Sequence, residues 1–291
     1  MKILLLGPNG QLGTDLVRVN EAAGAPLDIV AVDRARLELT DFDRVREVLG
    51  SLDFDALVNC SSYHKTDEVE ANAQTGVTIN AHLVGLLAEI SAAKKARFVH
   101  VSTDYVFGGQ DKRAPLDETD ARAPVNVYGA TKAMGEDLAR LACDDTLVLR
   151  VASLFGVAGA SGKGGNFVET MLRFGRERGK LKVVADQHMS PTSTKDIARA
   201  IVAMLGQGVG PGIWHVVNSD AATWHEFAAE IIARAGVAAD VEPIPSSEFP
   251  TPARRPAYSV LSNAKLGSAI GAQRPWREAL DEYLREKGHV G

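Results

Sequence analysis

Short apolar runs alternate with amphipathic segments through the first half of the chain. The runs are rich in Val, Ile and Leu, and helical periodicity fills the intervals between them. Nearly continuous apolar strands separated by helices are typical of a parallel sheet that helices cover on both faces. The predicted strands are Ile3–Leu6, Ile29–Val32, Leu57–Asn59, Phe98–Val101 and Leu147–Arg150. The predicted helices are Gln11–Glu21, Phe42–Leu49, Thr78–Ala93 and Val127–Ala142. This pattern predicts an α/β fold with a Rossmann-like, doubly wound parallel sheet and right-handed crossovers.

The pattern is looser after residue 150. Five prolines between Pro243 and Pro256 predict an extended segment there. The remaining predicted helices are Phe167–Arg178, Thr194–Leu205, Trp224–Ala235 and one near Pro275–Glu286, with strands at Leu181–Ala185 and Ile213–Val217. We therefore predict a large domain of residues 1–155 plus about 180–217, and a smaller C-terminal lobe of about 156–179 plus 218–291.

Composition narrows the class of protein. Apolar residues make up 45% of the 291 residues, so the chain can bury a core. The net charge of −5 and the lack of a basic run disfavour nucleic acid and anionic lipid as partners. Two cysteines form no disulfide framework, and the apolar run at the N-terminus stops at Gly7, too short for a signal peptide. No apolar stretch approaches the roughly 20 residues of a membrane span. These features predict a cytoplasmic protein that binds neither nucleic acid nor membrane.

A glycine-rich loop follows the first predicted strand. Gly7-Pro8-Asn9-Gly10-Gln11-Leu12-Gly13 leads into a predicted helix, whose first N–H groups can bind a pyrophosphate. Asp33 ends the second strand and can accept hydrogen bonds from an adenosine ribose. Together they predict a nicotinamide dinucleotide site. Asp33 favours NADH, whereas Arg34 could pair with the 2′-phosphate of NADPH or remain solvated, so the cofactor preference stays open.

Tyr128 and Lys132 stand four residues apart on a predicted helix and therefore share a face. A neighbouring ammonium lowers the pKa of a phenol and suits it to acid–base catalysis. Thr103 ends the fourth strand, and in a doubly wound sheet the carboxyl ends of strands face the ligand. Thr103 and Tyr128 are therefore predicted to bind one carbonyl oxygen. His100, inside that strand, is expected in the core or supporting the site.

Several motifs together carry a family resemblance. They are Ser102–Phe107, Asn126–Lys132, Val58-Asn59 with Asp67 and Glu70, Gly164–Val168, Asp186-Gln187 with Pro191-Thr192, and Arg255-Pro256 with Ser259 and Leu261. With the glycine-rich loop, the chain resembles the extended short-chain dehydrogenases/reductases, and within them the dTDP-4-dehydrorhamnose reductases. The resemblance covers almost the whole chain. It implies reduction by NADPH or NADH of the C4 ketone of a nucleotide-activated deoxysugar, dTDP-4-dehydro-L-rhamnose above all. The large domain would then bind the NAD(P) cofactor, and the lobe would bind the nucleotide sugar.

The resemblance also implies roles for individual residues. Tyr128 would donate the proton, Lys132 would support it and bind the cofactor ribose, and Thr103 would hold the carbonyl. The cofactor residues would be Gly7, Asn9, Gly10, Gln11, Leu12, Asp33, Arg34, Glu38, Leu39, Ser62, Tyr63, His64, Tyr128 and Lys132. The substrate residues would be Thr103, Asp104, Leu154, Asn166 and Arg255.

Some positions depart from the family pattern. Leu154 stands where relatives often carry a Trp that stacks on the sugar, and Met189 stands where they carry a Gly. Both are expected on the substrate side, so they leave the sugar open. Asp15 occupies a place where some relatives carry a Glu implicated in Mg²⁺ at a subunit contact, so the resemblance leaves a Mg²⁺ ion and a homodimer open beside a solvated helix face. Lys163, in the Gly-rich loop, could reach a diphosphate.

Three rival functions share this fold. An epimerase would keep its NAD bound through turnover, and a 4,6-dehydratase usually needs Asp-Glu after the Thr, where this chain has Asp104-Tyr105. A non-catalytic subunit resembling the regulatory subunit of methionine adenosyltransferase is the third rival, because fold alone does not fix function. The intact set of Thr103, Tyr128 and Lys132 favours catalysis.

Overall fold

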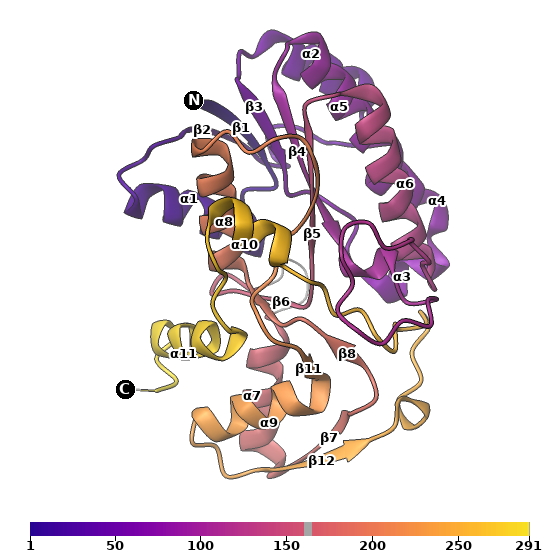
Figure 1. Cartoon of the computed structure of the whole chain (residues 1–291), viewed down its shortest axis with the longest axis vertical. Helices are drawn as coiled ribbons and strands as arrows, with labels where there is room; N and C mark the ends of the chain where they lie inside the picture. The colour runs from indigo at the N-terminus through magenta and orange to yellow at the C-terminus, as the bar shows by residue number, and fades with distance from the viewer. Residues whose placement is uncertain (160–164, 291) are drawn as a thin grey trace.

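A six-stranded parallel sheet forms the centre of the computed structural model, which describes residues 1–159 and 165–290 (Figure 1). The strand order is β10-β5-β4-β3-β1-β2, and every neighbouring pair is parallel. The strands are β1 (Lys2–Leu6), β2 (Asp28–Val32), β3 (Ala56–Asn59), β4 (Arg97–Thr103), β5 (Thr146–Val151) and β10 (Gly212–His215). The chain crosses from β2 on one side of β1 to β3 on the other. The carboxyl ends of β1 and β3 therefore flank a topological switch point, where such sheets bind ligands.

Helices cover both faces of this sheet, as the alternation of apolar runs predicts. Ile3 and Leu5 face a core with α1 (Gln11–Ala22) and α8 (Thr194–Gly206). Leu4 and Leu6 point to the opposite face. They face a second core that includes α2 (Phe42–Ser51), α5 (Leu83–Ala93) and α6 (Val127–Ala142). Successive residues of β1 are thus buried on both sides, which explains its unbroken run of apolar residues.

The segment before α5 differs from the single helix predicted over 78–93. The structure has α3 (Thr66–Ala71), α4 (Ala73–Val77) and a π-helix, η1 (Thr78–His82), that runs into α5. Asn80 lies in this π-turn and is fully buried. It accepts from Tyr63 N at 2.9 Å and donates to Thr131 Oγ1 at 3.1 Å. π-Turns often occur at functional sites, and here the turn ties the segment after β3 to α6.

Residues 73–93 also correct the expectation that no stretch is long and apolar enough to span a membrane. This helical stretch of 21 residues passes that test by length and composition, with half of its window buried. Leu83, Leu86 and Leu87 pack in the core against the sheet. The helix of a soluble core passes the same test, so the finding is weak evidence for a membrane.

The rest of the chain forms a second packed region below the sheet in Figure 1. Its core contains Phe155, Phe227, Trp276 and Tyr283. Its helices are α7 (Phe167–Arg178), α9 (Trp224–Arg234) and α11 (Trp276–Glu286). Three small sheets accompany them: β7 (Lys180–Val184) with β12 (Asp240–Ile244), β8 (His188–Met189) with β11 (Ala222–Thr223), and β6 (Leu154–Phe155) with β9 (Thr192–Ser193). The short elements η2 (Asp104–Val106), η3 (Ser246–Glu248) and α10 (Ala264–Ile270) complete the chain.

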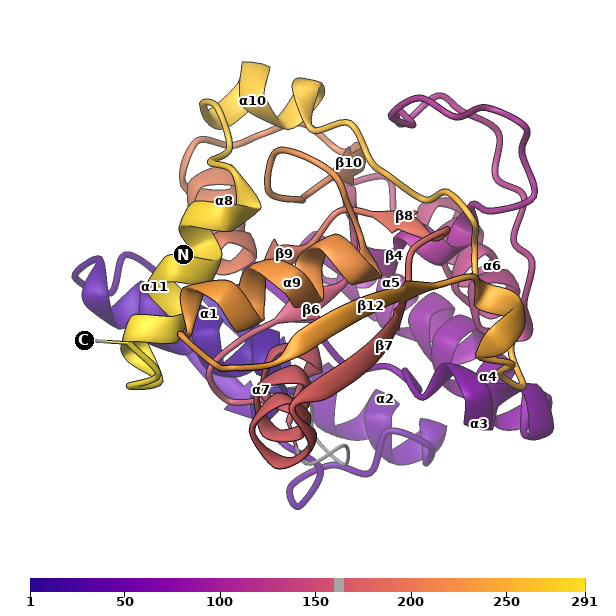
Figure 2. The same cartoon turned by 90° about the horizontal axis from the view of Figure 1, so that it is seen from below.

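The position of β7 changes the predicted boundary near residue 180. β7 pairs in parallel with β12, and this pair runs along α7 and α9 outside the six-stranded sheet (Figure 2). The sequence grouped residues 180–217 with the large domain. In the structure β7 lies outside the six-stranded sheet, whereas β10 is a strand of that sheet and α8 packs in its core. The overall division of the chain into two domains remains a prediction.

Candidate active site

A cavity of about 1090 Å³ opens at the carboxyl ends of β1, β3, β4 and β5. The residues that follow each of these strands line it, as the sheet topology dictates. They include the loop Gly7–Gly13 after β1, Cys60–Thr66 after β3, Thr103–Tyr105 around the end of β4, and Ala152–Leu154 after β5. The second packed region closes the cavity with Asn166, Phe167, Thr170 and Trp224.

The glycine-rich loop fits a dinucleotide. A Cβ on Gly13 would collide with the carbonyl oxygen of Gly7, so the turn closes only with glycine there. The closed turn directs the first residues of α1, Gln11 and Leu12, to the cavity wall. The buried Oε1 of Gln11 has no hydrogen-bond partner within the described protein. Gln11 Oε1 is an acceptor and needs a donor, whereas the first N–H groups of a helix need acceptors, so the N–H groups at this end of α1 suit a pyrophosphate.

The predicted adenosine residues divide into two groups. Asp33 and Arg34 line the cavity, whereas Glu38 and Leu39 do not belong to its lining. Asp33 accepts from Arg36 N at 3.0 Å through one oxygen. Arg34 is paired with Glu38 at 2.8 Å, but its side chain is 87% exposed. An ion pair this exposed stabilises little, so the guanidinium is free to turn toward a cofactor phosphate.

Thr103 and Tyr128 meet at the centre of the cavity, as predicted. Their hydroxyl groups share a hydrogen bond. A Cβ on Gly129 would collide with the carbonyl oxygen of Tyr105, so glycine there lets α6 approach η2 closely and bring Tyr128 to Thr103. Burial raises the pKa of Tyr128 above its usual range, and the Thr103 hydrogen bond lowers it only in part. The phenol is therefore protonated at neutral pH, as a proton donor must be.

Asp104 supports Thr103 from the buried side. Thr103 Oγ1 donates to Asp104 Oδ1 at 3.1 Å, and Ser259 Oγ donates to Asp104 Oδ2 at 2.6 Å. Ser259 belongs to the C-terminal segment, 155 residues away in sequence. Burial raises the pKa of Asp104 to about 6, against the lowering effect of both hydrogen bonds. Asp104 lines the cavity, and its hydrogen bond with Ser259 ties the end of β4 to the C-terminal segment.

Lys132 lies in the cavity wall, but its amine makes contacts that the spacing did not predict. Nζ donates to the carbonyl oxygen of Val101 at 2.7 Å and lies 3.2 Å from His100 Nε2. Burial lowers the pKa of Lys132 to about 8, against the raising effects of Glu136 and Cys60. Burial also has the largest effect on the pKa of Tyr128 and raises it, so the lowering of that pKa by Lys132 stays a prediction.

Behind Lys132 lies a buried ion pair that sequence reasoning missed. Glu136 Oε2 accepts from Arg150 Nη2 at 2.8 Å, and both side chains are almost completely buried. Glu136 Oε1 also accepts from Ser102 Oγ at 2.6 Å. The network joins α6, β4 and β5 immediately before Thr103. Ser102 and Glu136 are 34 residues apart along the chain, and Glu136 and Arg150 are 14 apart. Neither periodicity nor spacing therefore identifies the network.

The predicted substrate residues are not all brought together. Leu154 and Asn166 line the cavity. Asn166, however, caps α7 and donates to Gly156 O at 2.9 Å and to Tyr283 Oη at 3.1 Å. Arg255 is not among the lining residues; it pairs with Asp67 at 2.7 Å.

Met189, which the sequence placed on the substrate side, is buried in the core of the second packed region instead. Lys163 lies outside the described residues. The wall around Leu154 contains aromatic rings that spacing did not identify. Phe167 and Trp224 line the cavity with their ring centroids 4.8 Å apart.

Ser62, Tyr63 and His64 also line the cavity, on the side of β3. The backbone of Tyr63 is held by Asn80, with hydrogen bonds of 2.9 and 3.1 Å at its N and O atoms. These hydrogen bonds hold the backbone of this segment in the cavity wall, and its path beside the cofactor stays a prediction.

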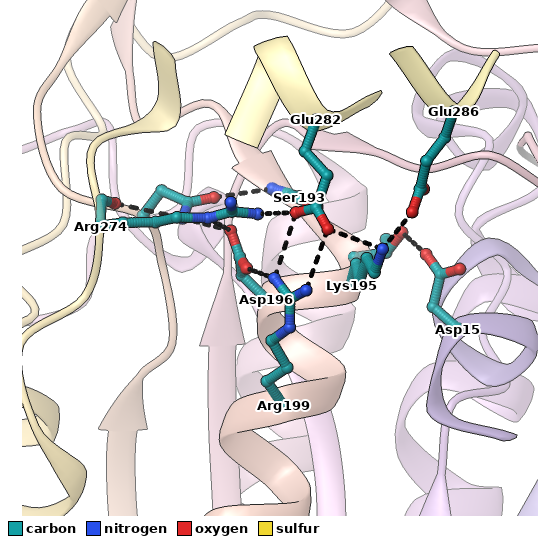
Figure 3. Close-up of polar contacts among 10 residues, drawn as sticks. Asp15, Ser193, Lys195, Asp196, Arg199, Arg274, Glu282 and Glu286 are labelled. Atoms are coloured by element: carbon teal, nitrogen blue, oxygen red, sulfur yellow. Dashed lines mark hydrogen bonds and ion pairs between the residues drawn. The ribbon is translucent and has the colours of Figure 1, made fainter. Parts of the chain in front are cut away.

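Asp15 does not fit a Mg²⁺ ion. Figure 3 shows that it faces α8 and α11 among charged residues of both signs. Thr194 Oγ1 donates a short hydrogen bond to Asp15 Oδ2. Lys195 forms ion pairs with Glu282 at 2.7 Å and with Glu286. The ammonium of Lys195 thus lies between Glu282 and Glu286, the carboxylates that a metal at this position would need as ligands.

Two arginines complete this network. Arg199 pairs with Glu282 at 3.0 Å, and Arg274 pairs with Glu282 and with Asp196. Burial raises the pKa of Glu282, but the three cations outweigh it and leave this pKa far below its usual range. Within residues 1–159 and 165–290, no group of three or more His, Cys, Asp or Glu side chains is arranged to hold a metal ion.

Comparisons with known proteins agree with this geometry. The family described as RmlD substrate binding domain matches residues 1–288. The chain is 36% identical to the spore coat polysaccharide biosynthesis protein SpsK of Bacillus subtilis, covering 98% of each chain. It is 36% identical to a dTDP-4-dehydrorhamnose reductase of Burkholderia thailandensis, covering 98% of this chain and 99% of the relative. Among solved structures, a dTDP-4-dehydrorhamnose reductase of Bacillus anthracis in complex with NADP has a TM-score of 0.90 at 32% identity, covering 98% and 99% of the two chains.

Proposed function

The chain belongs to the RmlD substrate binding domain family, and on that premise we propose that it reduces the C4 ketone of dTDP-4-dehydro-L-rhamnose to give dTDP-L-rhamnose. The observation that carries the proposal is the meeting of Thr103 and Tyr128 in the cavity beside the glycine-rich loop. Two hydroxyl groups can there hydrogen-bond a single carbonyl oxygen. The relatives of Burkholderia thailandensis and Bacillus anthracis are named dTDP-4-dehydrorhamnose reductases.

Each residue then has a definite task. Thr103 would turn its single hydroxyl proton from Asp104 Oδ1 to the ketone oxygen when the substrate binds. A reduced nicotinamide, when bound, supplies the hydride that converts the carbonyl carbon to an alcohol carbon. Tyr128 gives its phenolic proton to the alkoxide oxygen that develops. Its raised pKa keeps that proton available at neutral pH. The first turn of α1 would bind the pyrophosphate, and Lys132 would bind the cofactor ribose.

We infer that the cofactor is NADPH or NADH. A relative of the family binds NADP, and the exposed Arg34 can turn toward a 2′-phosphate. Asp33 beside it repels that phosphate and suits NADH. A comparison of kcat/KM for NADPH and NADH, each with the same sugar nucleotide, decides between them.

The test of the reaction is NADPH and NADH oxidation with dTDP-4-dehydro-L-rhamnose, with the product stereochemistry determined by NMR. Tyr128→Phe should lower kcat by about 10²-fold or more, because the proton donor is lost. Tyr258→Phe is the matched control, since Tyr258 is not among the cavity residues. A Tyr128→Phe enzyme with near wild-type kcat would contradict the acid role.

The same assay separates the rival functions. An epimerase converts its substrate without consuming added NAD(P)H in proportion to product. A non-catalytic subunit binds NAD(P)H and does not oxidise it with any 4-keto sugar nucleotide. We also infer that the protein is cytoplasmic and has no nucleic acid or membrane partner. A homodimer is the proposed assembly, and size-exclusion chromatography with light scattering tests it.

A further inference from the structure

His100 lies between two nitrogen atoms in the floor of the site. Its side chain is fully buried on β4. Nδ1 is 3.3 Å from Asn59 Nδ2, at the end of β3, and Nε2 is 3.2 Å from Lys132 Nζ, on α6. Burial and the nearby Lys132 keep the pKa of His100 well below its usual range, so the ring is neutral. A neutral imidazole has one N–H and one acceptor nitrogen, so the two contacts must differ in kind.

The orientation of Asn59 decides which nitrogen is the acceptor. Asn59 Oδ1 accepts from Ser61 N at 3.0 Å and from Ser61 Oγ at 2.5 Å. A backbone N–H can only donate, so this end of the side chain must be the oxygen. Asn59 therefore presents its NH₂ group to His100. Nδ1 of His100 accepts that hydrogen bond, and the ring proton resides on Nε2.

This arrangement directs an N–H group at Lys132. An uncharged amine can accept that hydrogen bond through its lone pair, whereas an ammonium can only donate. Protonation of Lys132 would therefore force the His100 proton to Nδ1. Nδ1–H would then face the NH₂ group of Asn59, which leaves two buried donors opposed.

We propose that Asn59 and His100 act as positioning residues that oppose the protonation of Lys132, because Asn59 favours the His100 tautomer that carries its proton on Nε2. The consequence for activity rests on the proposed reduction, because it requires Lys132 to work as an ammonium beside Tyr128. The tautomer itself can be measured without any turnover.

Other groups facing Lys132 act in the opposite direction. Glu136, one turn further along α6, and Cys60, after β3, both raise the pKa of Lys132. Val101 O accepts from its amine at 2.7 Å. Burial outweighs these influences and lowers the pKa of Lys132. The proposed effect of the Asn59–His100 pair is in the same direction.

The direct test is ¹⁵N NMR of the full chain with labelled histidine. Spectra recorded from about pH 6 to 10 cover both sides of the Lys132 pKa, which is about 8. Above that pKa, the ring proton of His100 should reside on Nε2; below it, the proton should move to Nδ1. In Asn59→Asp, the carboxylate accepts from Nδ1–H, so the proton should stay on Nδ1 at every pH. A wild-type ring that carries its proton on Nδ1 throughout would overturn the proposal, whatever the activity.

The second test is the pH dependence of kcat/KM. Activity should fall as the pH rises through the pKa of Lys132. Asn59→Asp removes the opposed donors and should move this alkaline limb upward by about one pH unit. Asn59→Ala removes the donor without adding a charge and should shift the limb in the same direction by less. Tyr258→Phe should leave it unchanged. An alkaline limb that both Asn59 variants leave in place contradicts the proposal, even if they reduce kcat.

Discussion

Replacing Glu136 with Gln tests whether the buried ion pair behind Thr103 stabilises the fold. The pair is buried on both sides, with 2% of the Arg150 side chain and 1% of the Glu136 side chain exposed. Glutamine keeps one oxygen for Ser102 Oγ or Arg150 Nε, which lie 2.6 and 2.9 Å from Glu136 Oε1. Its NH₂ group then meets Arg150 Nη2, which is also a donor.

The cost follows from the charge that remains. Removing one partner of a buried ion pair costs about 3–5 kcal/mol, because the other charge stays buried without compensation. For a chain of this size, we expect Tm to fall by roughly 6–10 °C, at about 2 °C per kcal/mol. The free energy of unfolding from urea titrations followed by circular dichroism measures the loss directly.

Two controls separate the buried charge from other effects. Asp137 lies next to Glu136 in sequence and pairs with Arg122 at 2.7 Å, but the Asp137 side chain is 48% exposed. We therefore expect Asp137→Asn to lower the free energy of unfolding by less than about 1 kcal/mol. Replacing Glu136 and Arg150 together by Met removes both charges and should recover most of the stability. A Glu136→Gln protein within about 1 kcal/mol of wild type would refute the reasoning.

Two further predictions concern other charged groups. Because the folded protein raises the pKa of Asp104 from 3.8 to about 6, its stabilising contribution is complete below pH 3.8 and is lost as the pH rises through about 6. Asp104→Asn should therefore remove a fall in unfolding free energy of up to about 3 kcal/mol between pH 4 and 7 in urea titrations; an unchanged slope would contradict it. Mg²⁺ should leave the wild-type Tm unchanged, whereas Lys195→Met should lower the free energy of unfolding by about 1 kcal/mol, because Glu282 and Glu286 lose a partly buried partner. A wild-type Tm that rises with Mg²⁺ and falls with EDTA would show that Lys195 does not take the place of a metal.

Local sequence signals predicted the elements that are decided locally. The helices Val127–Ala142 and Phe167–Arg178 have the predicted bounds. Asn126 and Asn166 cap their first turns through side-chain oxygens, and such caps are legible in the sequence. The pairing of β7 with β12 was not predictable in this way. It joins segments about 60 residues apart, and no local pattern states which strand a short apolar run will meet.

The same limit applies to the site. Thr103 and Tyr128 were predictable because strand ends and helix spacing place them at one edge of the sheet. The contact of Ser259 with Asp104 and the contact of Asn59 with His100 depend on tertiary packing between distant segments. Their residue types are ordinary in a core, so only the structure shows that they hold the residues of the site.

Lys132 shows how a correct spacing can carry an incomplete mechanism. Four residues on a helix place it on the same face as Tyr128, yet its amine contacts β4 through Val101 O and His100. Burial then opposes the ammonium that the spacing argument assumed, and the Nε2–H tautomer that we propose for His100 opposes it again. Burial lowers the pKa of Lys132 to about 8, so a change in the contacts of its amine can change its charge. The charge beside Tyr128 is then adjustable by any ligand oxygen that approaches the amine. The ribose hydroxyls that we propose Lys132 to bind are such oxygens, so we expect cofactor binding to favour the ammonium and complete the catalytic pair.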